Sequence, residues 1–222
     1  MKLFIDPGHG GKDPGATGNA LVEKTLNLAV ALAMEAQLQR SGIDVMLSRY
    51  VDEDVTLQQR TDRANAWGAD IFLSIHHNGF SDSTARGIET YYSTRPGECK
   101  QLADTVQKAL CATFSMPNRG VKTKLNSAGM DWYHVLRESR ASVAVITESG
   151  FVTSPADAEL LKQPDFPRRQ AEALAGAIKA LCGRQAVTEI EKLQLQVNEL
   201  TNRVDNVYKF LENLNKIIPL KY

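Results

Sequence analysis

The feature that most limits the fold of this chain is an alternation of short apolar segments with longer segments of helical spacing. The apolar segments are rich in branched and aromatic residues, which is typical of buried strands. They are residues 2–5, 43–47, 71–75, 88–92 and 143–147. Helical spacing occupies residues 22–38, 57–67, 102–114 and 168–182. The sequence therefore predicts an α/β fold, a mostly parallel twisted sheet with helices on both faces.

The pattern changes after Gly183. Thr188, followed three residues later by Glu191, is typical of the first turn of a new helix. Apolar residues then recur alternately three and four positions apart, up to Pro219. They are Ile190, Leu193, Val197, Leu200, Val204, Val207, Leu211, Leu214 and Ile218. Branched residues prevail at the a positions of this heptad repeat and Leu at the d positions, which favours a coiled coil of two parallel helices.

We therefore expect two parts, a domain over residues 1–183 and a C-terminal helix over residues 184–222. The helix is predicted to form a dimeric coiled coil through residues 188–218. Alternatively, it folds back onto the domain, but that arrangement would need a broader apolar face.

Charge and the N-terminal segment exclude several classes of protein. Lys plus Arg number 26 and Asp plus Glu number 26, so no basic field is expected that would hold nucleic acid or anionic lipid. The apolar run in residues 1–5 is too short for a signal peptide or a membrane helix. The three cysteines lack paired spacing and indicate reduced thiols. We expect a protein made in the cytoplasm, without membrane insertion.

Histidines gather where two predicted strands end. His9 lies in a glycine-rich segment after the first strand, and His76 and His77 end the third, so these positions hold three of the four histidines. The carboxyl ends of parallel strands meet at the edge where open sheets bind ligands. Zinc sites in hydrolases commonly combine two His with one carboxylate. Glu23 is a candidate for that carboxylate, although the spacing equally allows it to stabilise a helix N-terminus.

A further carboxylate, Glu148, follows the fifth predicted strand. If it points into the same cleft, it can deprotonate water activated by a metal and later protonate a leaving nitrogen. The alternative is a salt-bridged surface residue.

These residues resemble the zinc-dependent N-acetylmuramoyl-L-alanine amidases, a family of bacterial autolysins and phage endolysins. The resemblance covers residues 1 to about 183. It rests on residues 6–11, on Glu23 with residues 26–28, on residues 74–78 and on residues 148–151, and Arg49 and Arg60 also fall in the family's order.

The resemblance implies that His9, Glu23 and His76 bind one zinc ion and that Glu148 is the catalytic carboxylate. The family usually has a small residue where this chain has His77. Because neighbouring side chains of an extended segment point in opposite directions, we expect only one of the two adjacent histidines in the cleft.

The implied reaction is hydrolysis, by zinc-activated water, of the amide between N-acetylmuramic acid and the first L-alanine of the peptidoglycan stem peptide. Asn78, His134 and Arg137 are candidates for the border of the substrate groove, or for support of a loop. Without a signal peptide, such an enzyme would reach the wall after release through phage holin pores or mother-cell lysis. Two other functions stay open: a zinc peptidase or amidohydrolase acting on a soluble peptide, and a non-catalytic coiled-coil module that binds walls.

Overall fold

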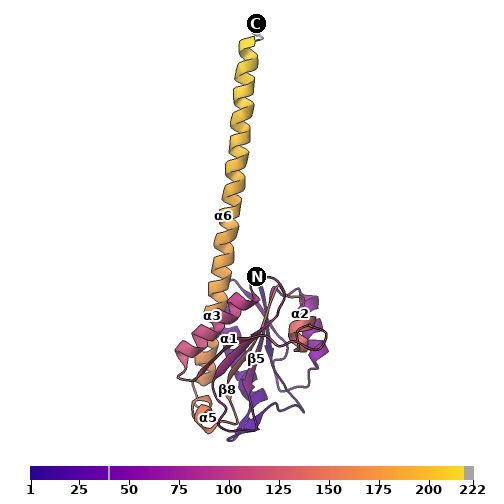
Figure 1. Ribbon diagram of the computed structural model, residues 1–222, viewed down its shortest axis with the longest axis vertical. Helices are drawn as coiled ribbons and strands as arrows, with labels where there is room; N and C mark the ends of the chain where they lie inside the picture. The colour runs from indigo at the N-terminus through magenta and orange to yellow at the C-terminus, as the bar shows by residue number, and fades with distance from the viewer. Residues whose placement is uncertain (40, 218–222) are drawn as a thin grey trace. The chain divides into compact units, whose positions relative to one another are not determined.

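A six-stranded sheet forms the centre of the unit Met1–Lys179 (Figure 1). The computed structural model describes residues 1–39 and 41–217. The strand order is β4-β1-β5-β8-β6-β7, and every neighbouring pair is parallel except β6 with β8. The strands are β1 (Lys2–Pro7), β4 (Asp44–Leu47), β5 (Ile71–Asn78), β6 (Ile88–Tyr92), β7 (Asn118–Lys122) and β8 (Val143–Phe151). The predicted mostly parallel sheet is confirmed, with β7 as an additional edge strand.

Helices connect most of the strands. They are α1 (Glu23–Leu38), α2 (Leu57–Trp67), α3 (Cys99–Thr113), α4 (His134–Glu138), α5 (Pro155–Leu161) and α6 (Phe166–Ile217). A small hairpin, β2 (Thr17–Gly18) with β3 (Leu21–Val22), leads into α1. Helix α2 has the bounds that the sequence predicts, because Thr56 and Gln59 form a capping box at its start and Gly68 ends it in the left-handed conformation, at φ 73°.

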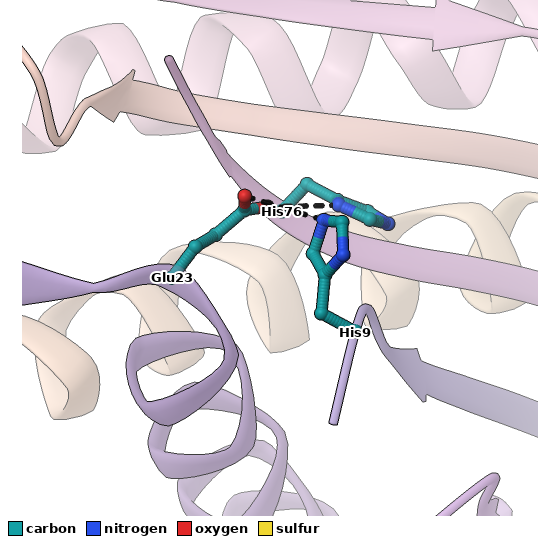
Figure 2. Close-up of side chains that lie close together, drawn as sticks. All are labelled: His9, Glu23 and His76. Atoms are coloured by element: carbon teal, nitrogen blue, oxygen red, sulfur yellow. Dashed lines mark hydrogen bonds and ion pairs between the residues drawn. The ribbon is translucent and has the colours of Figure 1, made fainter. Parts of the chain in front are cut away.

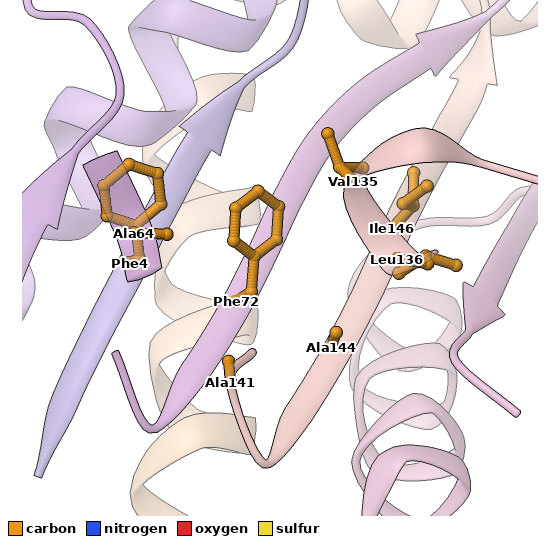
Figure 3. Packing of buried hydrophobic residues seen from close by; sticks show 8 residues of the cluster. All are labelled: Phe4, Ala64, Phe72, Val135, Leu136, Ala141, Ala144 and Ile146. Carbon is orange, nitrogen blue, oxygen red and sulfur yellow. The ribbon is translucent and has the colours of Figure 1, made fainter. Parts of the chain in front are cut away.

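Both faces of the sheet are covered. On one face, Phe4, Phe72 and Ala144 lie side by side in register on β1, β5 and β8. They pack with Ala64 of α2 and with the start of α4 (Figure 3). Helices α1 and α3 lie on the opposite face (Figure 1). With its faces covered, the sheet leaves the carboxyl ends of its central strands as the edge that can receive a ligand.

Helix α6 corrects the predicted break at Gly183. The helix is continuous from Phe166 to Ile217, and the Thr188 hydroxyl donates to the carbonyl of Arg184, four residues earlier, as a hydroxyl inside a helix does. Thr188 therefore does not begin a new helix. A single glycine costs a helix only about 1 kcal/mol, which a long helix tolerates. The division between the two compact units falls within α6, between Lys179 and Ala180.

The second unit, from Ala180 onward, carries the predicted heptad stripe. Its described stripe residues, from Ile190 to Leu211, are between 49% and 65% exposed. Ile218 and Pro219 lie outside the described residues. Within the described ranges, no helix combines the length and apolar character that crossing a membrane requires.

Candidate active site and metal centre

Three side chains with metal-binding atoms meet at the carboxyl edge of the sheet. His9 follows β1, Glu23 is the first residue of α1, and His76 lies on β5. His9 Nε2 lies 3.2 Å from Glu23 Oε2, and His76 Nδ1 lies 2.9 Å from Glu23 Oε1 (Figure 2). One ligand atom from each residue lies within 4.8 Å of the other two. The structure thus brings together the three residues that the sequence proposes as metal ligands.

Close backbone approach makes this cluster compact. A Cβ atom on Gly8 would lie 2.1 Å from the His76 ring, and one on Gly15 would lie 2.6 Å from Glu23 Oε2. His9 itself adopts a left-handed backbone conformation, with φ 61°, that residues other than glycine rarely occupy. The glycine-rich segment after β1 therefore allows both histidines to reach Glu23.

Two buried arginines hold the segment that carries His9. Arg60 donates to the carbonyl oxygens of His9 at 2.7 Å and Pro7 at 2.8 Å, and Arg49 donates to Pro7 at 3.1 Å. Arg60 also forms a 2.6 Å ion pair with Asp6. Burial alone would raise the pKa of Asp6, but Arg60 and two serine hydroxyls hold it below its usual range. Hydrogen bonds from Arg49 and Arg60 to the backbone of this segment thus hold His9 in its strained conformation.

The charges of the cluster favour an added cation. Burial would raise the pKa of Glu23, but hydrogen bonds and charge interactions with both histidines hold it well below its usual range. Burial would lower the pKa of His9, yet Glu23 and Asp13 raise it to about 9. Asp13 Oδ2 lies 2.7 Å from His9 Nδ1 and leaves Nε2 facing Glu23. Two imidazoles and one carboxylate are a ligand set that fits a divalent metal. A metal-binding histidine commonly has a carboxylate partner on its other ring nitrogen, as Asp13 is for Nδ1 of His9.

His77 points away from the cluster. Its ring is fully buried, with Nδ1 2.8 Å from Asn27 Oδ1 and Nε2 3.0 Å from Gln170 Oε1. Burial lowers the pKa of His77 to about 4. Of the two adjacent histidines, His76 faces Glu23 with its ring and His77 packs between α1 and α6, as the alternation of an extended strand requires.

A cavity of about 600 Å³ opens over the cluster. It is lined by His9, His76 and Glu148 and by residues 54–57 and 133–135. Glu148 lies directly opposite His76 across the pairing of β5 and β8. Burial raises the pKa of Glu148 well above its usual range, and the negative charge of Glu23 adds to the shift. Its Oε2 atom is buried and has no hydrogen-bond partner among the residues that the structure describes, so it is available to a ligand in the cavity.

Of the three predicted substrate contacts, the structure places one at the cavity and two away from it. His134 lines the cavity, and its buried Nε2 atom has no hydrogen-bond partner within the described part of the chain. Asn78 donates to Glu89 at 3.0 Å, and Arg137 donates to the backbone carbonyls of Asp131 and Trp132. Asn78 and Arg137 therefore hold neighbouring segments and do not line the cavity.

Sequence reasoning missed several supporting residues. It assigned no role to Asp13 or Asn27, and it noted Arg49 and Arg60 only by their order. Asp13 follows His9 by four positions, a spacing that could have indicated a carboxylate partner for the ring. The partners of the arginines are backbone carbonyls, which leave no mark in a sequence.

The fold and the site define a class, the α/β proteins with a two-histidine, one-carboxylate candidate metal centre beside a second carboxylate. Residues 3–180 match the family model of N-acetylmuramoyl-L-alanine amidases. The chain belongs to this family.

Relatives and solved structures agree with this assignment. The chain is 41% identical over 182 residues to the sporulation-specific N-acetylmuramoyl-L-alanine amidase of Bacillus subtilis (strain 168), covering 81% of this chain and 67% of the relative. It is 42% identical over 173 residues to the amidase CwlM of Bacillus licheniformis, covering 75% and 62%. The catalytic domain of the amidase CwlV from Bacillus (Paenibacillus) polymyxa var. colistinus superposes with a TM-score of 0.74 at 34% identity, covering 82% of this chain and 98% of that structure.

The matched relatives differ in length. The chain spans 67%, 34% and 62% of three B. subtilis and B. licheniformis amidases that it matches. The shared part is therefore the amidase domain, whereas the rest of those proteins has no counterpart in the match.

Proposed function

We propose that this chain hydrolyses the amide between N-acetylmuramic acid and L-alanine in peptidoglycan. The observation that carries the proposal is that His9, His76 and Glu148 line one cavity and that Glu23 joins the two histidines, in a chain that belongs to the amidase family. The names of the relatives support the same bond and the same polymer.

One zinc ion per chain, held by His9, Glu23 and His76, is the proposed cofactor. Three protein ligands would leave a fourth position of a tetrahedral site open, as in catalytic rather than structural zinc sites. When bound, zinc supplies a Lewis acid that polarises an amide carbonyl and lowers the pKa of water toward ~7. Asp13 keeps the His9 ring turned with Nε2 toward Glu23.

Glu148 is the proposed proton carrier. Its Oε2 atom, which has no partner among the described residues, can accept a proton from the attacking water and return it to the leaving nitrogen. Burial favours its protonated form, which suits the second of these steps. His134 is proposed to contact the substrate from the cavity wall, whereas Asn78 and Arg137 would act only through the segments that they hold.

Metal content and turnover, measured together, test these roles. His9→Ala and His76→Ala should lose zinc and activity together, because each removes a ligand. Glu148→Gln should keep zinc but lower kcat by about 10²–10⁴, the usual contribution of a general acid–base. His134→Ala is the matched control for the cavity wall and should keep zinc. A zinc-free Glu148→Gln protein, or one with a near-normal rate, would contradict the assignment.

We also propose that two copies associate through the heptad stripe of α6. The described stripe residues, from Ile190 to Leu211, are exposed on the helix, as an unpartnered coiled-coil seam would be. Leu200→Lys places a charge in the seam and should shift the mass from dimer to monomer in light scattering. Leu195, 70% exposed and outside the stripe, provides the control, because Leu195→Lys should stay dimeric. A monomeric wild type, or equal masses for both variants, would refute the dimer.

A further inference from the structure

A series of buried hydrogen bonds runs behind the candidate metal centre and ends at Glu23. Gln170 of α6 donates from Nε2 to Ser149 Oγ at 2.9 Å, and its Oε1 atom lies 3.0 Å from His77 Nε2. His77 Nδ1 lies 2.8 Å from Asn27 Oδ1. The Asn27 amide then donates to Glu23 Oε1 at 3.4 Å. Ser149, Gln170, His77 and Asn27 have no exposed surface, so water does not compete for these contacts.

The partners of Asn27 determine which nitrogen of His77 carries a proton. Asn27 Nδ2 faces two groups that only accept, Glu23 Oε1 and the carbonyl of Gly8 at 3.1 Å. The Asn27 amide must therefore present its NH2 group to them and its carbonyl oxygen to His77. An oxygen only accepts, so His77 Nδ1 must donate the hydrogen bond that joins the two side chains.

The other side of the ring follows from the same reasoning. A neutral His77 with its proton on Nδ1 has only a lone pair on Nε2. The structure has Gln170 Oε1 toward the ring and Nε2 toward Ser149, so a neutral ring requires the Gln170 amide turned over, with its NH2 group toward His77. The Ser149 hydroxyl allows both orientations, because it can donate as well as accept. With the Gln170 amide turned in this way, every hydrogen bond in the series would run from Ser149 toward Glu23. His77 also donates directly to Glu23 from its backbone, at 3.1 Å from Oε1.

We propose that His77 is a positioning residue, which fixes Asn27 and through it the Glu23 carboxylate in the orientation that the metal centre needs. This inference rests on the proposed role of Glu23 as a zinc ligand. Partners behind the metal ligands typically contribute about 10–100-fold to metal affinity. His77 thus has a role in the site although its ring does not face the cavity, and α6 contributes to the site through Gln170.

Two substitutions separate positioning from the filling of space. His77→Asn leaves an NH2 group where Nδ1–H lies and can still donate to Asn27. His77→Gln loses less volume but reaches toward Gln170 instead. We expect the full-length His77→Asn protein to bind Zn²⁺ nearly as tightly as the wild type in a calorimetric titration. The His77→Gln protein should bind it about 10–100-fold more weakly. Equal affinities of the two variants, or the reverse order, would overturn the proposal.

The protonation of His77 can be read directly in the metal-free wild-type protein. Nitrogen-15 NMR of the imidazole rings distinguishes a proton on Nδ1 from one on Nε2, and the His77→Gln spectrum assigns the signal among the four histidines. A proton on Nδ1, in a neutral or charged ring, supports the proposal. A neutral ring with its proton on Nε2 would refute it. Neither result depends on zinc binding or amidase activity, so a failure here is distinct from a failure of the proposed function.

Discussion

Two adjacent histidines occupy opposite environments in this protein. His76 shares the carboxylate of Glu23 with His9, whereas His77 is enclosed by Asn27 and Gln170. Strand alternation predicts from the sequence that only one of them faces the cleft. The choice of His76 and the role of Glu23 came from the family resemblance, because spacing does not say which side of a strand faces a ligand. The partners of His77 come from α1 and α6, and no local pattern could have identified them.

The buried pair of Asp6 and Arg60 gives a prediction for stability against pH. Because the pKa of Asp6 is lowered in the folded protein, the unfolded chain takes up the proton first as the pH falls. The contribution of the Asp6 carboxylate to the free energy of unfolding is therefore complete above about pH 4, the usual pKa of an aspartate, and is lost as the pH falls below it. Asp6→Asn should lower the free energy of unfolding by about 3–5 kcal/mol at neutral pH, since it leaves Arg60 unpaired.

Urea unfolding of the metal-free wild type and of Asp6→Asn, from neutral to strongly acidic pH, measures this difference. The two proteins should converge in stability as the pH falls below about 4. A difference that does not change with pH would show that the pair is not the source of the effect.

At the scale of elements, capping residues explain which helix boundaries the sequence predicts correctly. Helix α2 is bounded by Thr56 and Gly68, whose caps fix both ends through local interactions. Gly183 resembles such an end signal but lies inside α6, because nothing in the structure requires it to adopt a left-handed conformation. Strand β7 was missed because its sequence, Asn118–Lys122, has little apolar character and its place at the sheet edge depends on pairing with β6.

The two glycines should respond oppositely to substitution. Apart from the backbone of its own helix, a Cβ atom on Gly183 meets no atom of the described residues within 4 Å, so Gly183→Ala should stabilise the helical segment by about 0.4–1 kcal/mol. Gly68→Ala should destabilise the protein by about 1–2 kcal/mol, because it places a side chain at φ 73°. Thermal unfolding followed by far-ultraviolet circular dichroism measures both. A destabilising Gly183→Ala would contradict the continuous helix.

At the scale of the whole molecule, we propose different functions for the two units. The family match ends at residue 180, where the second unit begins, so the amidase domain lies in the first unit, and association remains a proposal for the second. In a dimer, two amidase domains would be linked on one polymeric substrate. The second domain would then act at a raised effective concentration, which increases retention on the wall without any new contact.

The central claim concerns one bond, and the products of wall digestion identify it. Purified peptidoglycan sacculi are incubated with the zinc-loaded wild type and with Glu148→Gln, and the soluble products are analysed by mass spectrometry and end-group chemistry. We predict that the wild type releases free stem peptides with new N-terminal alanine and no new reducing sugar, whereas Glu148→Gln releases almost none. Cleavage within the stem peptides or new reducing ends would contradict the assignment. So would an enzyme that cleaves soluble peptides but leaves the sacculi intact.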